Sequence, residues 1–128
     1  MPIVTHNPPG LFPPYRAYSH AVEVRGVARQ LVISGLNGYE ADGVTMPDAF
    51  DAQAENVWTH LETILRTAGM DVHDLVSIRT YLADPADDEA NVLMRVKHLR
   101  GHAPASTVVC CRLLDPRWKL EVEAIAAK

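Results

Sequence analysis

The last quarter of the chain constrains the fold most strongly. Residues 120–126 read Leu-Glu-Val-Glu-Ala-Ile-Ala, and a strand with this sequence points Glu121 and Glu123 to one face. The opposite face carries Leu120, Val122, Ala124 and Ala126. Two carboxylates on one strand face are typical of a solvated sheet surface, and they are also compatible with a reactive site. The alternation therefore predicts a strand with one fully apolar side.

A second strand is predicted just before it. Residues 107–111 read Thr-Val-Val-Cys-Cys, which is apolar on both faces, as expected when both faces of a strand are buried. Asp115, Pro116 and Arg117 give a turn signal between the two segments. We therefore expect residues 104–126 to form a hairpin.

The rest of the chain alternates strand and helix patterns. We expect strands near residues 19–24, 30–34 and 74–82, and helices at 48–67 and 88–99. With the final pair, the order is β-β-α-β-α-β-β, which predicts an α+β domain over residues 1–128 with one sheet covered by two helices. Residues 1–17 are rich in proline and are expected to form an extended arm.

The two predicted helices differ in how clearly the sequence defines their apolar stripe. The first has a regular apolar stripe that includes Phe50, Val57 and Leu61, with Asp48 as its expected cap and Gly69 as its expected stop. The second has only a narrow stripe, formed by Val92, Val96 and Leu99. Its expected polar face carries Arg95, Lys97, His98 and Arg100.

Composition excludes several classes of function. The net charge is −4 and no basic patch is present, so we expect no nucleic-acid partner. No apolar run approaches the roughly 18 residues of a membrane span, and no secretory signal is visible, so we expect a cytoplasmic protein without membrane contact. Cys110 and Cys111 face opposite ways and do not match a metal-ligand spacing, so free thiols and no metal are expected. No nucleotide-binding motif occurs, and no cofactor is expected.

Four segments in register carry a resemblance to a known family. They are YSHAVEV at residues 18–24, LVISG at 31–35, PAST-V at 104–108, and W-KLEVEAIA at 118–126. Together they resemble the RidA (YjgF) family of reactive-intermediate deaminases, from about Asn7 to Lys128. The resemblance implies a chorismate-mutase-like fold and a homotrimer in which three sheets enclose a central barrel. It also implies that a small-molecule substrate binds in clefts between subunits.

One departure from the family pattern is important for function. Ser106 stands where the imine-deaminase branch has an arginine that grips the substrate carboxylate, and Val108 stands where that branch has a cysteine. A serine hydroxyl cannot replace the two parallel hydrogen bonds of a guanidinium. Arg112, Arg95 or Arg79 of a symmetry-related chain could supply the missing charge.

The resemblance also implies site residues. Glu121 matches the glutamate that positions a water molecule, and Tyr18 matches a tyrosine near the cleft. Ser34 and Gly35 match the "SG" after the second strand, while Ser106 and the backbone groups of Thr107 and Val108 are expected to contact substrate. Tyr18 could equally be a packing residue at a strand start. His20 shares its strand face, whereas His98 and His102 are expected at the surface.

The expected function is a deaminase-like hydrolase that acts on an imine or enamine and releases ammonia. Because Ser106 carries no charge, we expect a substrate other than the usual small 2-imino acids, such as a dicarboxylic enamine of the 2-aminomuconate type. The alternative is a non-catalytic, trimeric small-molecule-binding or regulatory protein of the same fold.

Overall fold

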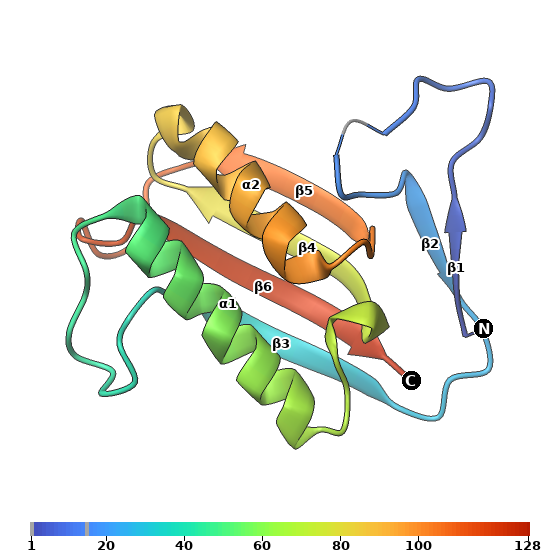
Figure 1. Ribbon diagram of the computed structural model, residues 1–128, viewed down its shortest axis with the longest axis horizontal. Helices are drawn as coiled ribbons and strands as arrows, with labels where there is room; N and C mark the ends of the chain where they lie inside the picture. Colours follow the sequence, from blue (N-terminus) through green and yellow to red (C-terminus); the bar gives the residue numbers. More distant parts are fainter. Residues whose placement is uncertain (1, 15) are drawn as a thin grey trace.

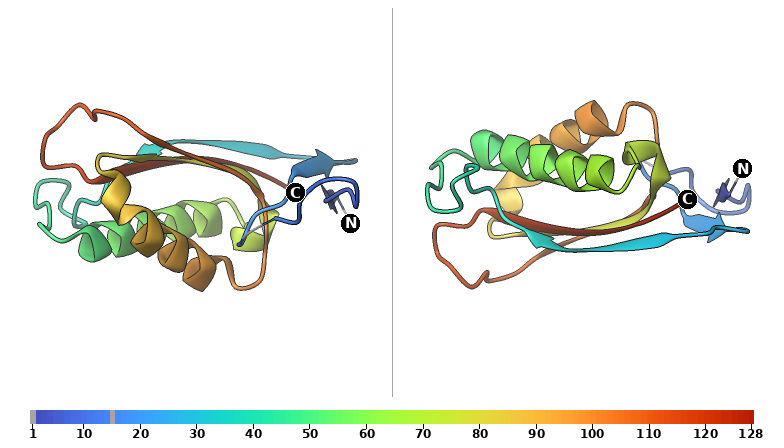
Figure 2. Two further views of the ribbon diagram at one scale, coloured as in Figure 1. Left: turned by 90° about the horizontal axis from the view of Figure 1, so that it is seen from above. Right: turned by 90° about the horizontal axis from the view of Figure 1, so that it is seen from below.

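A four-stranded sheet with two helices on one face forms the body of the molecule (Figure 1). The computed structural model describes residues 2–14 and 16–128. The sheet order is β3-β6-β4-β5, with β3 at Gln30–Leu36, β6 at Leu120–Ala127, β4 at Leu75–Leu82 and β5 at Ala105–Cys110. The helices are α1 at Phe50–Thr67 and α2 at Asp88–Leu99, and both lie on the same side of the sheet (Figure 2). The predicted α+β fold is confirmed.

The N-terminal part forms a separate two-stranded ribbon. Strand β1 (Ile3–His6) pairs antiparallel with β2 (Ala21–Val24), so the predicted extended arm contains a strand that its prolines did not suggest. The ribbon is joined to the sheet at the outer edge of β5. There Ser19 forms a bridge with Ala105, its amide donates to the Pro104 carbonyl at 3.0 Å, and its hydroxyl donates to the Ala103 carbonyl at 2.6 Å.

The predicted C-terminal hairpin is wrong, because β4 lies between β5 and β6. Strand β5 runs parallel to β4, with Ile78 opposite Ser106, and β6 runs antiparallel to β4, with Thr80 opposite Val122. A parallel pair needs a long crossover, and α2 supplies it between β4 and β5. Residues 111–119 then pass around the end of β4, where the Cys111 amide donates to the Leu82 carbonyl at 2.9 Å.

The hydrophobic core lies between the helices and the sheet. The predicted stripe of α1 is buried, and Val57 and Leu61 are fully shielded from solvent. Gly69 follows the C-terminal end of α1 with a φ of +72°, as predicted for a helix stop. The prediction that Asp48 caps the start of this helix is wrong. The helix begins at Phe50 after Ala49, and no side chain caps it. A register shift between Leu75 and Ser77 turns Leu75 toward the helices, although simple alternation placed it on the other face.

Helix α2 has the predicted bounds, and Val92 and Leu99 of its predicted stripe are buried, but its buried face is rotated away from Val96. Val96 is 42% exposed, whereas Arg95 and His98, both predicted on the polar face, are only 6% and 8% exposed. The His98 ring stacks on Trp58, with 5.4 Å between ring centroids and 8° between ring planes. His102 is half-buried, with its Nε2 2.7 Å from the Leu75 carbonyl oxygen. The expectation that both histidines are at the surface is therefore wrong.

Among the described residues, no helix is both long and apolar enough to cross a membrane.

Gln53 of α1 holds two loops against the core. Its side chain is fully buried, and its amide nitrogen donates to the carbonyl oxygens of Pro47 and Arg117 at 2.7 and 2.9 Å. Its amide oxygen accepts from the Lys119 backbone N–H at 2.9 Å. The side chain thus fixes the loop before α1 and the start of β6 at once.

Replacing Gln53 with alanine should destabilise the protein. Three backbone groups would lose their partner in a partly buried place, so we expect the free energy of unfolding to fall by about 2–4 kcal/mol. Gln30→Ala, at an exposed position of β3, is the matched control and should stay within about 0.5 kcal/mol of the wild type. Urea denaturation at a fixed protein concentration measures both. Equal stability of the two variants would contradict this role of Gln53.

Candidate functional site

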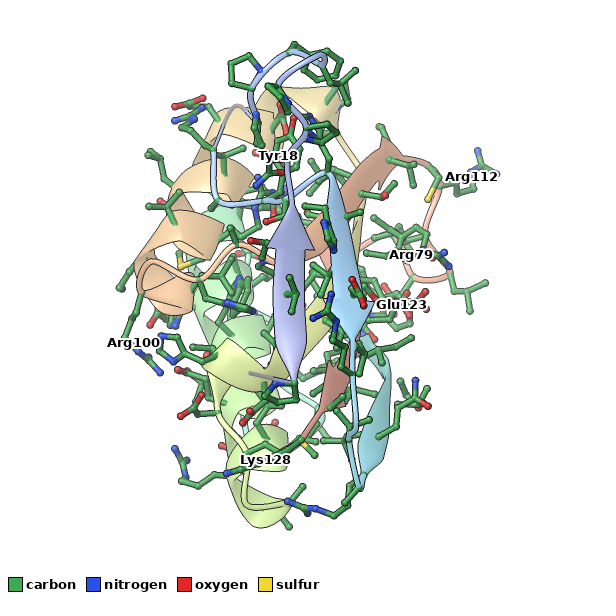
Figure 3. All side chains as sticks on the ribbon, turned by 90° about the vertical axis from the view of Figure 1, so that its right-hand side faces the viewer. Tyr18, Arg79, Arg100, Arg112, Glu123 and Lys128 are labelled. Atoms are coloured by element: carbon green, nitrogen blue, oxygen red, sulfur yellow. The ribbon has the colours of Figure 1, made fainter. Side chains whose placement is uncertain are left out.

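The sheet face turned away from the helices carries a row of polar side chains. Figure 3 shows Arg79, Glu123 and Arg112 together on this side. The Tyr81 hydroxyl donates to Glu123 Oε1 at 3.3 Å, and Arg79 Nη1 lies 3.7 Å from the same oxygen. Burial and the neighbouring Glu123 carboxylate raise the pKa of Tyr81. Glu123 is therefore held by two partners on its own sheet.

Glu121 lies on the same face but has no such partners. Its carboxylate makes no hydrogen bond or ion pair with any residue that the structure describes. It rests against the backbone of Gly35: a Cβ built on that glycine would lie 2.9 Å from the Glu121 Cδ and closer still to Oε2. Glu121 also borders an open hollow of about 290 Å³ with Tyr81 and Arg112. A carboxylate left free beside a hollow can accept a proton from a bound water.

A second group of polar side chains is buried on the opposite side of the sheet. We call it the α2 cluster, and it consists of Tyr18, Asn91, Arg95 and Ser106. Asn91 and Arg95 are one turn apart on the inner face of α2 and are 3% and 6% exposed. Ser106 lies opposite the buried Ile78 in the register, so it points toward the helices, and its Oγ is buried without a partner among the described residues.

Helix geometry places Arg95 at about the level of Ser106 along the sheet. Asp88, at the start of α2, shares a pocket with residues 108–110 of β5. Arg95 lies seven positions further along the helix, about 10 Å away. Strand β5 runs in the opposite direction to α2, so the same distance corresponds to about three residues back along the strand from residues 108–110. This is the position of Ser106. Tyr18 is also near, because its hydroxyl group acts on the pKa of Arg95 and raises it.

The segment before β2 covers this cluster. The Arg95 Nη2 donates to the Arg16 carbonyl at 3.1 Å. The Phe12 and Tyr18 rings each make a T-shaped contact with the His20 ring, with 5.2 and 6.1 Å between ring centroids. Arg16 forms two hydrogen bonds to the Glu89 carboxylate in the first turn of α2, at 2.8 and 3.1 Å. From here on, the arm means residues 7–14 and 16–20 of this segment, which contact α2 and lie over the α2 cluster.

The site residues predicted from the sequence fall into two groups in one chain. Gly35 and Glu121 lie together on the open face, and Ser34 is exposed on that face next to the buried Ile33. Thr107 is also on that face, opposite Arg79. Tyr18, Ser106 and Val108 belong to the other side, where Val108 packs against the core. One copy of the chain therefore does not bring Glu121 and Ser106 together.

Asn91 and Arg95 were missed by the sequence analysis as residues of one site. A signal was present, because two polar residues spaced by four share one face of a helix. Their burial could not be read from that spacing alone. Among the described residues, no group of three or more His, Cys, Asp or Glu side chains is placed to hold a metal ion.

Comparisons with known proteins identify the family. The sequence profile described as Endoribonuclease L-PSP matches residues 11–128. The chain is 30% identical over 112 residues to the mouse 2-iminobutanoate/2-iminopropanoate deaminase, covering 87% of this chain and 80% of the mouse protein. It therefore belongs to the Rid family, also called the YjgF family.

Solved structures agree with this assignment. The chain matches the Rid-family protein YyfB of Yersinia pestis, a protein of unknown function, with a TM-score of 0.91 and 30% identity over the full length of both chains. It matches RidA of an Antarctic Psychrobacter species with a TM-score of 0.74 and 29% identity, covering 87% of this chain and 88% of that one.

A double-mutant cycle tests the contact between Gly35 and Glu121. An added Cβ at residue 35 meets the flexible end of the Glu121 side chain, so the penalty should depend on that side chain. We expect Gly35→Ala to lower the free energy of unfolding by about 1 kcal/mol more in the wild type than in a Glu121→Ala background. Denaturation curves of the four proteins measure the difference. An identical penalty in both backgrounds would show that the two residues do not interact.

Proposed function

We propose that this protein is a deaminase that hydrolyses an imine or enamine and releases ammonia, with Glu121 as the base that activates water. The observation that carries the proposal is the Glu121 carboxylate, which lies beside Gly35 at a hollow and has no hydrogen-bond or ion-pair partner among the described residues. The membership of the chain in a family that includes 2-iminobutanoate/2-iminopropanoate deaminases supports the same chemistry.

The reaction requires few catalytic groups. Glu121 accepts a proton from water as the oxygen adds to the carbon of the C=N bond. The nitrogen of the tetrahedral adduct takes up a proton and leaves as ammonia, and the carbinol collapses to a carbonyl group. An enamine first takes a proton at carbon to become the imine. The sum is one imine and one water giving one carbonyl compound and one ammonia, and no redox step is needed.

The site is proposed to form between two copies of the chain in a homotrimer. Glu121 and Ser106 occupy opposite faces of one sheet, so a complete site needs the open face of one copy next to the α2 cluster of another. The open face has apolar side chains to bury in such contacts: Val32 is 72% and Val109 is 43% exposed in the single chain. The outer edge of β3 is also unpaired in the sheet.

The proposed substrate differs from the usual small 2-imino acids. No guanidinium stands at residue 106, so the carboxylate grip on β5 that those substrates use in the family is missing. A larger imine or enamine, such as a dicarboxylic enamine, fits a site that must hold its ligand by other groups.

A non-catalytic binding protein of the same fold is the second candidate. It is favoured by the loss of the arginine at Ser106 and by the arm, which closes the α2 cluster from solvent. Hydrolysis of RNA, which the family description names, is disfavoured by the net charge of −4, because phosphate backbones are bound by basic surfaces.

Ammonia release from freshly generated imines and enamines tests the proposed function. We expect Glu121→Ala to lower kcat/KM by about 100-fold or more, because the base is lost. Glu123→Gln is the matched control, since Glu123 lies on the same strand face but is held by Tyr81 and Arg79, and it should keep most of the activity.

Two results would reject the deaminase proposal. One is full activity of Glu121→Ala. The other is a wild-type protein that is silent on the whole panel while Ser106→Arg gains activity on 2-imino acids. The second result would favour the non-catalytic candidate, because the fold would be intact and only the substrate grip would be absent.

A further inference from the structure

Arg95 is a buried cation whose donors are mostly unused. Its side chain is 6% exposed, and only Nη2 has a hydrogen-bond partner, the Arg16 carbonyl. Nε and Nη1 have no partner in the part of the chain that the structure describes, and they carry three of the five N–H donors of the guanidinium. A buried charge is normally paired, because leaving it unpaired opposes folding. A buried guanidinium with unused donors therefore indicates a binding site for a functional ligand.

No carboxylate of the described residues is placed to neutralise Arg95. Asp88 acts on it through space from two turns away along α2. Burial is the main cause that lowers the pKa of Arg95, and the positive charge of Arg16 acts in the same direction, while Asp88 opposes both. A ligand that carries a negative charge would offset the burial of the guanidinium.

The neighbouring groups are also donors that lack acceptors. Within residues 2–14 and 16–128, the buried Asn91 Nδ2 has no hydrogen-bond partner, and neither does the buried Ser106 hydroxyl. An anion with several acceptor oxygens would satisfy these groups and the guanidinium together. A cationic or purely apolar ligand would satisfy none of them.

We propose that Arg95, with Asn91 and Ser106, binds the carboxylate of a small organic acid beneath the arm. The cation thus comes from α2, on the helix side of the sheet, and the anion is proposed to lie where the arginine of the imine-deaminase branch would stand, since serine is the smaller side chain at residue 106. The inference deepens the proposed function, because it names a carboxylate-bearing imine or enamine as the ligand class.

A ligand would reach the cluster past the part of the arm that contacts α2. It closes the cluster through the Arg16 carbonyl and through the pair of Arg16 with Glu89, whose side chain is 67% exposed. Exposed ion pairs contribute little to stability. Loosening this part of the arm would therefore open a path to Arg95 without unfolding the sheet.

Binding measured apart from turnover tests the proposal. Calorimetric titration of the full-length protein uses 2-oxobutanoate and trans,trans-muconate as probes, and butanone as the matched neutral ligand. We expect at least one carboxylate to bind and butanone not to bind. Arg95→Gln should weaken carboxylate binding about 10- to 100-fold, as expected when charge-assisted hydrogen bonds are lost. Arg95→Lys should also bind weakly, since it keeps the charge and loses the planar fork. Arg66→Gln, at an exposed arginine in the last turn of α1, should bind like the wild type.

Thermal stability separates binding from a structural role. An unpaired buried charge opposes folding, so Arg95→Met should melt at the same temperature as the wild type or higher while losing the carboxylate. A large fall in melting temperature, unchanged binding by Arg95→Gln, or failure of both carboxylates to bind would overturn the inference. The two proposals fail separately. Carboxylate binding through Arg95 without ammonia release rejects only the deaminase, and ammonia release that is unaffected in Arg95→Gln rejects only the role of Arg95.

Discussion

The two-sided character of β6 organises the molecule. Its pairing with β3 and β4 in the middle of the sheet buries Leu120, Val122 and Ala124 under the helices, and the strand pleat then forces Glu121 and Glu123 onto the open face. A shift of the register by one residue would place both carboxylates in the core. The position of the proposed base is thus tied to the same pairing that forms the core.

The same geometry separates the functional groups. Glu121 lies on the open face, whereas Arg95, Asn91 and Ser106 lie on the helix side, and the sheet stands between them. In the part of the chain that the structure describes, one side has a carboxylate without a partner and the other has buried donors without acceptors. Assembly of copies would satisfy both needs, because the open face of one chain and the α2 cluster of the next would then share one ligand.

Local patterns predicted the elements, and contacts distant in sequence decided the rest. The alternation at 120–126 predicted both faces of β6, and the bounds of α2 were predicted correctly as 88–99. The face of α2 was predicted only in part, since Val92 and Leu99 are buried but Val96 is exposed. Stacking of His98 on Trp58 and the contact of Arg95 with the arm fix the rotation of the helix. The predicted hairpin failed because β4, far away in sequence, pairs with both strands. Gly35 was predicted as a site residue from the family resemblance. Arg95 was named from the sequence only as one of three candidate cations, and its burial under the arm needed the folded structure.

Complementation between two inactive variants tests the shared site most directly. Glu121→Ala and Arg95→Gln proteins are unfolded, mixed in equal amounts and refolded together, and ammonia release is compared with that of each variant refolded alone. In a homotrimer, about a quarter of the clefts in the mixture would join an intact Glu121 to an intact Arg95 of the neighbouring copy, so a matching share of wild-type activity should return. If the mixture stays as inactive as its components, the two residues do not act in one site formed by two chains.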